Sequence, residues 1–162
     1  MSKRIILVTT LLLAAACTTT TTTNDNRLET TPRHDEWVTI DSAGRPLHAY
    51  VVYPQSSRKS GAVLVIHENR GLTDWVRTVA DRLAERGYIA IAPDLLSGAA
   101  PGGGRTSDFP TSDAAREAIS KLPREQVMTD LANAAKYVRT LPSANGKLAV
   151  AGFCWGGGRT FD

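Results

Sequence analysis

The order of apolar and polar positions along the chain predicts a domain in which strands alternate with helices. Two short β-rich runs, Glu36 to Ile40 and Leu47 to Tyr53, flank the turn-rich segment 41–46 and predict an antiparallel hairpin. Continuous apolar runs are typical of strands that are buried on both faces. Three such runs follow the hairpin: Ala62 to Ile66, Tyr88 to Ala92 and Leu148 to Gly152.

Two amphipathic segments between these runs predict helices. Apolar residues recur at helical spacing over 73–86, with Gly87 as a C-cap, and again over 129–141, where Pro142 ends the pattern. This alternation favours an α/β fold with a mostly parallel sheet and helices on both of its faces. The segment 97–121 breaks the rhythm, and a long loop of this kind is more often an active-site lid or excursion than filler.

Residues 1–17 read as a targeting leader. Lys3 and Arg4 precede a short apolar stretch, and small residues lead up to Cys17. A cysteine after small residues resembles the bacterial lipobox, which predicts lipidation of Cys17 and a membrane-anchored lipoprotein facing the periplasm or the cell exterior. Residues 14–16 also fit ordinary cleavage, which would give a soluble periplasmic protein, and an uncleaved anchor is a third possibility.

Residues 18–35 are expected to form a disordered tether, because residues 18–23 are all threonine and the stretch has little to bury. The folded domain is therefore expected to span 36–162. We expect no disulfide, since a lipidated Cys17 has no free thiol and Cys154 stands in a motif that needs one. The formal net charge is +3, and two of the positive charges lie in the leader. No basic stripe is left elsewhere, which argues against a nucleic-acid partner.

The end of the chain carries the strongest chemical signal. The run 148–152 leads directly into Gly-Phe-Cys-Trp-Gly-Gly at 152–157. A strand that enters G-x-C-x-G-G is a nucleophile elbow, a sharp strand-to-helix turn that presents a reactive side chain at the top of a sheet. Cys154 is then the nucleophile and the backbone amide of Trp155 an oxyanion donor. The alternative is that Cys154 is a buried cysteine packed as a small hydrophobe.

His67-Glu68-Asn69-Arg70-Gly71 follows the 62–66 strand and is the second candidate constellation. The loop after that strand supplies the second oxyanion donor of an elbow site, so the amide of Asn69 is a candidate. A carboxylate of Glu68 beside Cys154 would keep the thiol protonated at rest through like-charge repulsion. Its alternative role is an ion pair with Arg70 or another cation. His67 is expected to be a structural imidazole that bonds loop backbone.

Other titratable side chains are expected to be structural. His34 falls in the tether and His48 on a strand. Asp94 ends the 88–92 strand segment and is expected to cap the next turn rather than to act in catalysis. Arg105 could meet an anionic substrate, but a solvated surface position is the stronger expectation. No histidine, cysteine and carboxylate set has metal-ligand spacing, so neither a metal nor another cofactor is expected.

Together these motifs resemble the dienelactone hydrolase family of α/β-hydrolases. The resemblance rests on H-E-N-R-G-L at 67–72, R-L-A-E-R-G-Y at 82–88, A-P-D-L at 92–95 and G-F-C-W-G-G at 152–157. It implies an α/β-hydrolase fold and hydrolysis of a small-molecule ester or lactone through Cys154, as in a carboxymethylenebutenolidase. It also implies that Glu68 gates the thiol and that the amides of Trp155 and Asn69 form the oxyanion hole.

The resemblance further implies an aspartate and a histidine after the nucleophile. Eight residues follow Cys154, and none of them is a histidine. We therefore expect the sequence to hold only the N-terminal portion of the fold and to be inactive by itself. Two alternatives to the hydrolase are a non-catalytic fragment and a redox-sensing thiol at Cys154.

Overall fold

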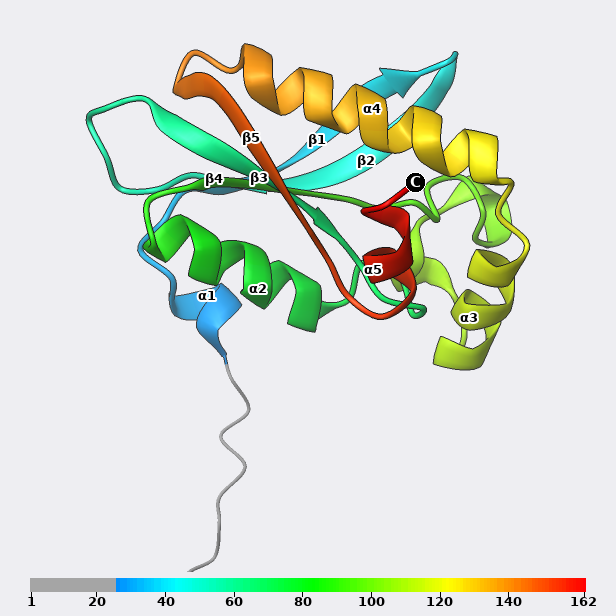
Figure 1. The fold of residues 1–162 in the computed structure, drawn as a ribbon. Coiled ribbons are helices and arrows are strands. Elements are labelled where there is room, and N and C mark those ends of the chain that lie inside the picture. The colour runs from blue at the N-terminus through cyan, green and yellow to red at the C-terminus, as the bar shows by residue number, and fades with distance from the viewer. Residues whose placement is uncertain (1–25) are drawn as a thin grey trace, which may run out of the picture.

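A computed structural model describes residues 26–162 and shows a five-stranded sheet with helices on both faces (Figure 1). The strand order is β1-β2-β4-β3-β5. Helix α4 (Arg124–Thr140) covers one face, while α2 (Asp74–Glu85) covers the other. The predicted α/β class and the helices on both faces are thus confirmed.

The sheet has an antiparallel half and a parallel half. Strands β1 (Asp35–Ser42) and β2 (Arg45–Val52) form the predicted hairpin, and β2 pairs antiparallel with β4 (Ile89–Pro93). Ala43 and Gly44 join β1 to β2 with φ values of 52° and 78°, as the tightest hairpin turns require. Strand β3 (Ser60–Ile66) pairs in parallel with both β4 and β5 (Ala144–Gly152).

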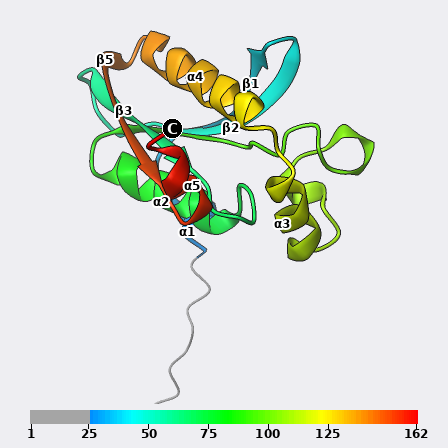
Figure 2. The same ribbon diagram turned by 45° about the vertical axis from the view of Figure 1, so that its right-hand side comes forward.

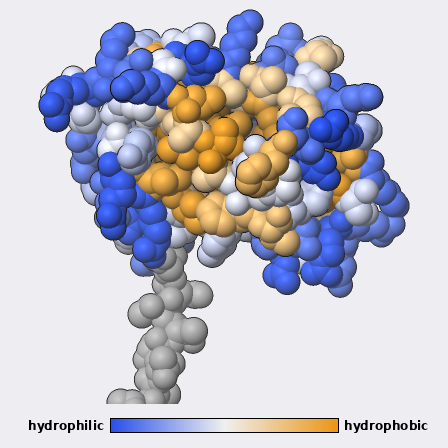
Figure 3. All heavy atoms as spheres, in the orientation of Figure 1, coloured by the Kyte–Doolittle hydropathy of each residue, from blue (hydrophilic) through white to orange (hydrophobic). Residues whose placement is uncertain are grey.

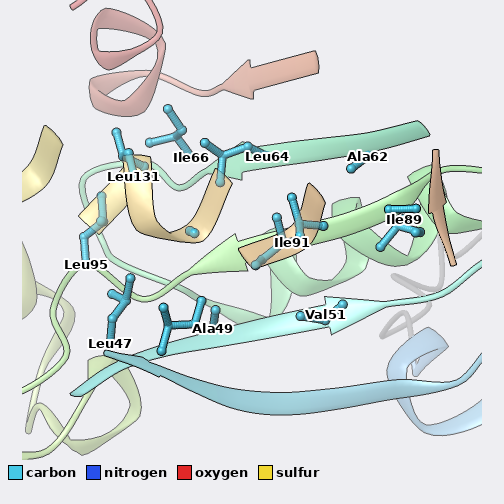
Figure 4. Packing of buried hydrophobic residues seen from close by; sticks show 14 of the residues in the cluster. Leu47, Ala49, Val51, Ala62, Leu64, Ile66, Ile89, Ile91, Leu95 and Leu131 are labelled. Atoms are coloured by element: carbon cyan, nitrogen blue, oxygen red, sulfur yellow. The ribbon is translucent and has the colours of Figure 1, made fainter. Parts of the chain in front are cut away.

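Side chains that alternate along the central strands build two cores, one on each side of the sheet. Leu64 and Ile66 point toward α4, while Val63 and Val65 of the same strand point toward α2. Figure 4 shows the α4-side core, in which β2, β3 and β4 all contribute side chains around Leu131. Because β3 and β4 are covered on both faces, their sequences are continuously apolar, as the sequence predicted.

Strand β5 differs from the prediction of a third buried strand. It forms an edge of the sheet that residues 26–162 build, and Val150 is 47% exposed. Apolar surface gathers over β5, beside α5 (Trp155–Arg159), on the face shown in Figure 3. The apolar run predicted the strand correctly but not its exposure, because a run of this kind does not say how many neighbours the strand has.

The predicted tether 18–35 overlaps the described residues from Asn26 onward, and there the expectation of disorder is wrong. Helix α1 (Arg27–Thr30) lies against α2. Arg27 and Arg33 both form ion pairs with the fully buried Asp81 of α2, and Thr31 Oγ1 donates a hydrogen bond of 2.6 Å to the same carboxylate. The polar composition of this segment is explained by the buried charge that it neutralises. Residues 1–25, including Cys17, lie outside the described part of the chain.

The long segment between β4 and α4 contains more structure than a loop. It holds two short 3-10 turns, η1 (Pro101–Gly103) and η2 (Thr106–Asp108), and helix α3 (Ser112–Ser120). Figure 2 shows α3 standing away from the sheet beside the carboxyl ends of the parallel strands. Among residues 26–162, no helix is both long and apolar enough to span a membrane.

Candidate active site

Two segments that carry predicted site residues leave the sheet side by side. Strands β3 and β5 are parallel neighbours, and Ile66 is paired with Gly152. Glu68 and Cys154 each stand two residues past these paired positions. Both therefore emerge at the carboxyl ends of the two strands, on the same side of the molecule. The amide of Phe153 donates a hydrogen bond of 3.2 Å to the carbonyl of Ile66, which joins the two strand ends directly.

The backbone at Cys154 has the strained geometry of a nucleophile elbow. Its φ is 51° and its ψ is −115°, and α5 starts at the next residue. A non-glycine residue with positive φ is uncommon, and strain of this kind gathers at functional sites. The thiol is free and exposed. This geometry presents the predicted nucleophile to solvent and does not fit a cysteine buried as a small hydrophobe.

Two glycines allow the elbow to approach the sheet this closely. A Cβ added to Gly156 would collide with the carbonyl oxygen of His67 and crowd that of Ile66, and one added to Gly152 would collide with the carbonyl of Gly156. These obstacles are backbone atoms, which cannot swing aside. Gly158 faces open space, so crowding explains some of the glycines in the motif but not all of them.

The two predicted oxyanion donors are placed on the two adjoining segments. Trp155 follows Cys154 at the start of α5, and Asn69 lies in the loop after β3. Within residues 26–162, neither backbone amide donates a hydrogen bond to another protein group. Both amides are therefore free to donate to a ligand oxygen, as an oxyanion hole requires.

His67 is a structural imidazole, as the sequence predicted. It is fully buried, its Nδ1 lies 2.8 Å from the carbonyl oxygen of Glu68, and its Nε2 accepts a hydrogen bond of 3.3 Å from the amide of Leu95. Because Leu95 can only donate, the ring is neutral with its proton on Nδ1. Its plane is stacked on the Trp155 indole. Both nitrogens are thus committed to backbone groups, which leaves none for base catalysis.

The other two histidines lie away from the elbow. His34 stacks on Tyr53, with ring centroids 5.3 Å apart, and His48 Nδ1 lies 3.2 Å from the hydroxyl of Thr39 in the hairpin. Both fit the structural roles expected of them.

Glu68 is half-buried and lines a cleft beside the elbow. No ion pair of Glu68 or of Arg70 exists within residues 26–162, so the alternative of a structural pair between them is not what the structure shows. The carboxylate therefore stands unneutralised on the segment next to the one that carries Cys154.

The cleft has a volume of about 840 Å³. It separates the start of α2 from the segment between β4 and α4, which we call the β4–α4 excursion. Trp75 is 52% exposed on one wall, and its ring meets that of Phe153 edge-on at 5.0 Å. Because Phe153 precedes Cys154, this wall lies beside the elbow, although Cys154 itself is not among the residues that line the cleft. The Thr73 hydroxyl, also at this wall, has no hydrogen-bond partner in the described chain. Phe109, Pro110, Thr111 and Ser112 form the opposite wall.

Asp94 has the structural role that was expected for it. Its buried carboxylate accepts a hydrogen bond of 3.1 Å from the amide of Leu96, which caps the turn after β4. It also accepts hydrogen bonds from the amide and hydroxyl of Thr106, at 2.9 and 2.7 Å. Sequence reasoning did not identify Thr106 or Trp75, because no local motif marks a threonine or tryptophan whose partners lie on distant segments.

Arg105 is not the solvated surface residue that was expected. It is half-buried, and its guanidinium lies 3.9 Å from the ring centroid of Trp37. Arginine stacks in this way because the ring face is electronegative. The expectation was wrong because the partner tryptophan belongs to β1, far away in the sequence. In the part of the chain that the structure describes, no group of three or more metal-ligating side chains is present.

A strand-to-helix elbow at the edge of a sheet with helices on both faces defines an α/β-hydrolase. Comparison with known families gives the same assignment at a finer level. The model of the dienelactone hydrolase family matches residues 47–162, and the chain belongs to that family.

Curated relatives carry consistent names. A Yersinia pestis protein, provisionally named a carboxymethylenebutenolidase, is 33% identical over 132 residues, covering 80% of this chain and 48% of the relative. Carboxymethylenebutenolidase 1 of Cupriavidus pinatubonensis is 31% identical over 126 residues, covering 77% and 53%. The chain thus spans about half the length of these relatives.

Solved structures support the fold. A Klebsiella pneumoniae protein, provisionally described as a dienelactone hydrolase, superposes with a TM-score of 0.65 at 28% identity, covering 76% of this chain and 51% of that one. The dienelactone hydrolase of Anabaena variabilis superposes with a TM-score of 0.56 at 18% identity, covering 78% and 54%. The second comparison bears on the fold alone.

Proposed function

We propose that Cys154 is the nucleophile of a carboxylic ester or lactone hydrolase. The observation that carries this proposal is the exposed thiol at a strained elbow, set beside two unpaired amides. The Cys154 thiolate attacks the carbonyl carbon, and the oxyanion that forms accepts hydrogen bonds from Trp155 and Asn69. Collapse breaks the bond between the carbonyl carbon and the leaving oxygen. The leaving oxygen departs as an alkoxide and takes a proton from solvent to become the alcohol. Water then hydrolyses the thioester to the carboxylic acid and regenerates the Cys154 thiol.

The names of the curated relatives suggest lactones, in the manner of carboxymethylenebutenolidase, as a substrate class. Deprotonation of the thiol and activation of water are not assigned to a residue of this chain, because none of His34, His48 and His67 is placed to act as the base. A first test should therefore use a step that needs no general acid. Acylation by a p-nitrophenyl ester is such a step, since p-nitrophenolate leaves without being protonated.

The test is stoichiometric reaction of the chain with p-nitrophenyl acetate. We expect one equivalent of p-nitrophenolate per chain and an acetyl group on the peptide that contains Cys154. Cys154→Ala should abolish both. The matched control is the same chain in urea, where the thiol is present but the oxyanion hole is not. A burst no faster in the native chain than in urea would contradict the proposal and favour a non-catalytic fragment.

The same sample discriminates the redox alternative. Hydrogen peroxide would oxidise a sensor cysteine to its sulfenic acid, which dimedone traps. Efficient trapping at Cys154 without ester acylation would favour the sensor. We expect the ester to acylate Cys154 in the same sample, whether or not peroxide also oxidises the thiol.

We also propose that Glu68 restrains the thiolate until substrate binds. The support is its unneutralised carboxylate on the segment that adjoins the elbow. Like charges disfavour one another at short range, so Glu68→Gln should raise the rate at which iodoacetamide alkylates Cys154 near neutral pH. Glu117→Gln, on the outer surface of α3, is the matched control and should leave that rate unchanged. An unchanged rate in Glu68→Gln would remove the gate from the proposal.

For localisation, we propose export and a lipid anchor on Cys17, with a soluble periplasmic form as the alternative. The support is the leader pattern of residues 1–17. Metabolic labelling with an alkyne fatty acid should tag the wild-type protein and not Cys17→Ala. A wild-type protein that is exported but untagged would favour the soluble form.

A further inference from the structure

Thr106 makes three hydrogen bonds that join two distant segments at the candidate site. Its hydroxyl donates to Asp94 Oδ1 at 2.7 Å and accepts from the amide of Leu72 at 3.0 Å, and its own amide donates to Asp94 Oδ2 at 2.9 Å. We call this set of contacts among Thr106, Asp94 and Leu72 the Thr106 latch. It ties the β4–α4 excursion to the loop that follows β3.

The latch rests on a rigid base. Asp94 is 1% exposed at the end of β4, and the amide of Leu96 supplies a further hydrogen bond to its carboxylate. A buried carboxylate holds its donors strongly, because losing one of them leaves charge unsatisfied in a medium of low polarity. Because Asp94 is buried at the end of β4, its hydrogen bonds fix the position of Thr106 relative to the sheet.

Packing adds to the hydrogen bonds. Gly71 has a φ of 83°, and a Cβ placed on it would overlap with the side chain of Thr106. The Thr106 side chain thus occupies the space where a residue other than glycine at position 71 would have its Cβ. Backbone and side chain fit together here, so the loop cannot shift toward the excursion.

The loop of residues 68–72, the Glu68 loop, is consequently held at both ends. At its start, the carbonyl of Glu68 lies 2.8 Å from His67 Nδ1 of the buried imidazole. At its end, the latch holds Leu72. Between the two anchors lies Asn69, whose amide is an oxyanion donor in the function proposed above. Displacing such a donor by about 1 Å can lower a rate roughly 100-fold.

We propose that Thr106 is a positioning residue, which sets the oxyanion hole by fixing the Glu68 loop through Asp94 and Leu72. This inference rests on the proposed function of Cys154. It assigns to the excursion a role in the chemistry of acylation, in addition to forming one wall of the cleft.

The test compares two reactions of the same thiol. Acylation by p-nitrophenyl acetate passes through an oxyanion, whereas alkylation by iodoacetamide does not. Both reactions are compared in a Glu68→Gln background, so that a displaced Glu68 carboxylate cannot change the reactivity of the thiol. In that background, Thr106→Val keeps the shape of the side chain but removes the hydroxyl, so it should slow acylation about tenfold or more while alkylation changes less than twofold. Thr106→Ser restores the hydroxyl and should acylate within about twofold of the wild type. Thr140→Val is the matched control, since its hydroxyl bonds a backbone carbonyl on the exposed end of α4.

Hydrogen exchange gives a readout that does not depend on activity. In Thr106→Val, amides of the Glu68 loop should exchange faster, while those of β4 remain as in the wild type. Equal loop exchange in both proteins would overturn the proposal, whether or not the chain is acylated. So would equal slowing of acylation and alkylation, or failure of Thr106→Ser to restore acylation. If wild-type Cys154 is not acylated at all but the loop loosens, the proposed function fails while the positioning of the Glu68 loop stands.

Discussion

The imidazole of His67 lies nearly parallel to the indole of Trp155, with ring centroids 5.8 Å apart and planes 13° apart. The imidazole precedes the Glu68 loop, and the indole follows Cys154. The contact therefore joins the two segments that carry the proposed oxyanion donors, and it does so through a histidine that is held neutral.

The first prediction concerns the pH dependence of stability. Burial lowers the pKa of His67, against smaller opposing effects of the Glu68 carbonyl and the charges of Asp94 and Glu68. The unfolded chain binds a proton near pH 6.5 where the folded chain does not. The free energy of unfolding should therefore fall as the pH drops below about 6.5, by up to about 1.4 kcal/mol per pH unit. Above about pH 6.5, His67 should add no pH dependence to the free energy of unfolding.

His67→Gln isolates this effect, because glutamine does not titrate and can still accept the hydrogen bond from Leu95. Urea unfolding from pH 5 to 8 should show a shallower loss of stability in the variant than in the wild type. Both proteins keep His34 and His48, whose contributions cancel in the difference. Parallel curves would show that His67 does not govern the acid side of the profile.

The second prediction concerns the glycines of the elbow. Gly156→Ala should lower the free energy of unfolding by about 3 kcal/mol or more, because its Cβ meets backbone carbonyls of His67 and Ile66. Gly158→Ala is the matched control, since nothing lies within 4 Å of its added Cβ. As alanine favours a helix over glycine, this variant should be as stable as the wild type or slightly more stable. Similar losses in the two variants, measured by urea unfolding, would refute the assigned crowding.

The third prediction is that the backbone conformation at Cys154 lowers the free energy of unfolding. Cys154 has φ 51° and ψ −115°, a region that glycine enters without strain. Cys154→Gly should therefore be about 1–3 kcal/mol more stable than Cys154→Ala, although neither variant can be acylated. Comparing the two variants with each other removes the contribution of the thiol. Equal melting midpoints would mean that the elbow is not strained.

The fourth prediction concerns the buried charge that holds the N-terminal segment. Burial of Asp81 opposes its ionisation, but hydrogen bonds from Arg33, Thr31 and Arg27 outweigh burial and hold its pKa below the usual range. Its contribution is therefore present above about pH 4 and is lost as the pH falls through the folded-state pKa. Asp81→Asn should destabilise the protein by about 3 kcal/mol near neutral pH, because two arginines lose their buried partner.

Asp113→Asn is the control for that variant. Asp113 also pairs with an arginine, Arg116, but its side chain is 85% exposed. Its loss should cost less than about 1 kcal/mol. Calorimetry of both variants decides the matter, and an equally small effect in Asp81→Asn would show that residues 27–33 contribute little to the fold.

The sequence predicted the strands and the two long helices because their signals are local. Continuous apolar runs marked β3 and β4, and helical spacing marked α2 and most of α4. Other elements depend on partners that are distant in the sequence. Helix α1 is polar because it neutralises Asp81, and a polar stretch alone reads as disordered. Helix α3 lies in a segment whose glycines and prolines masked its short apolar face.

The candidate site divides in the same way. Cys154, Trp155, Glu68 and Asn69 belong to two short motifs, so local sequence was enough to nominate them. Thr106 lies in no motif, and its importance comes from Asp94 and Leu72, which stand on two other segments. The candidate reactive residues could be nominated from the sequence, whereas the residues that hold them in place required the three-dimensional arrangement.

The pairing of β5 with β3 also determines when the elbow can form. The strands are parallel, and β4, α3 and α4 are all synthesised between them. Long-range parallel pairings close large loops and form late in folding. The strained backbone at Cys154 is anchored through Phe153 and Gly156 to the end of β3, so it cannot form before that pairing does. Along the folding pathway, Cys154 therefore lacks the elbow geometry until β5 has paired with β3.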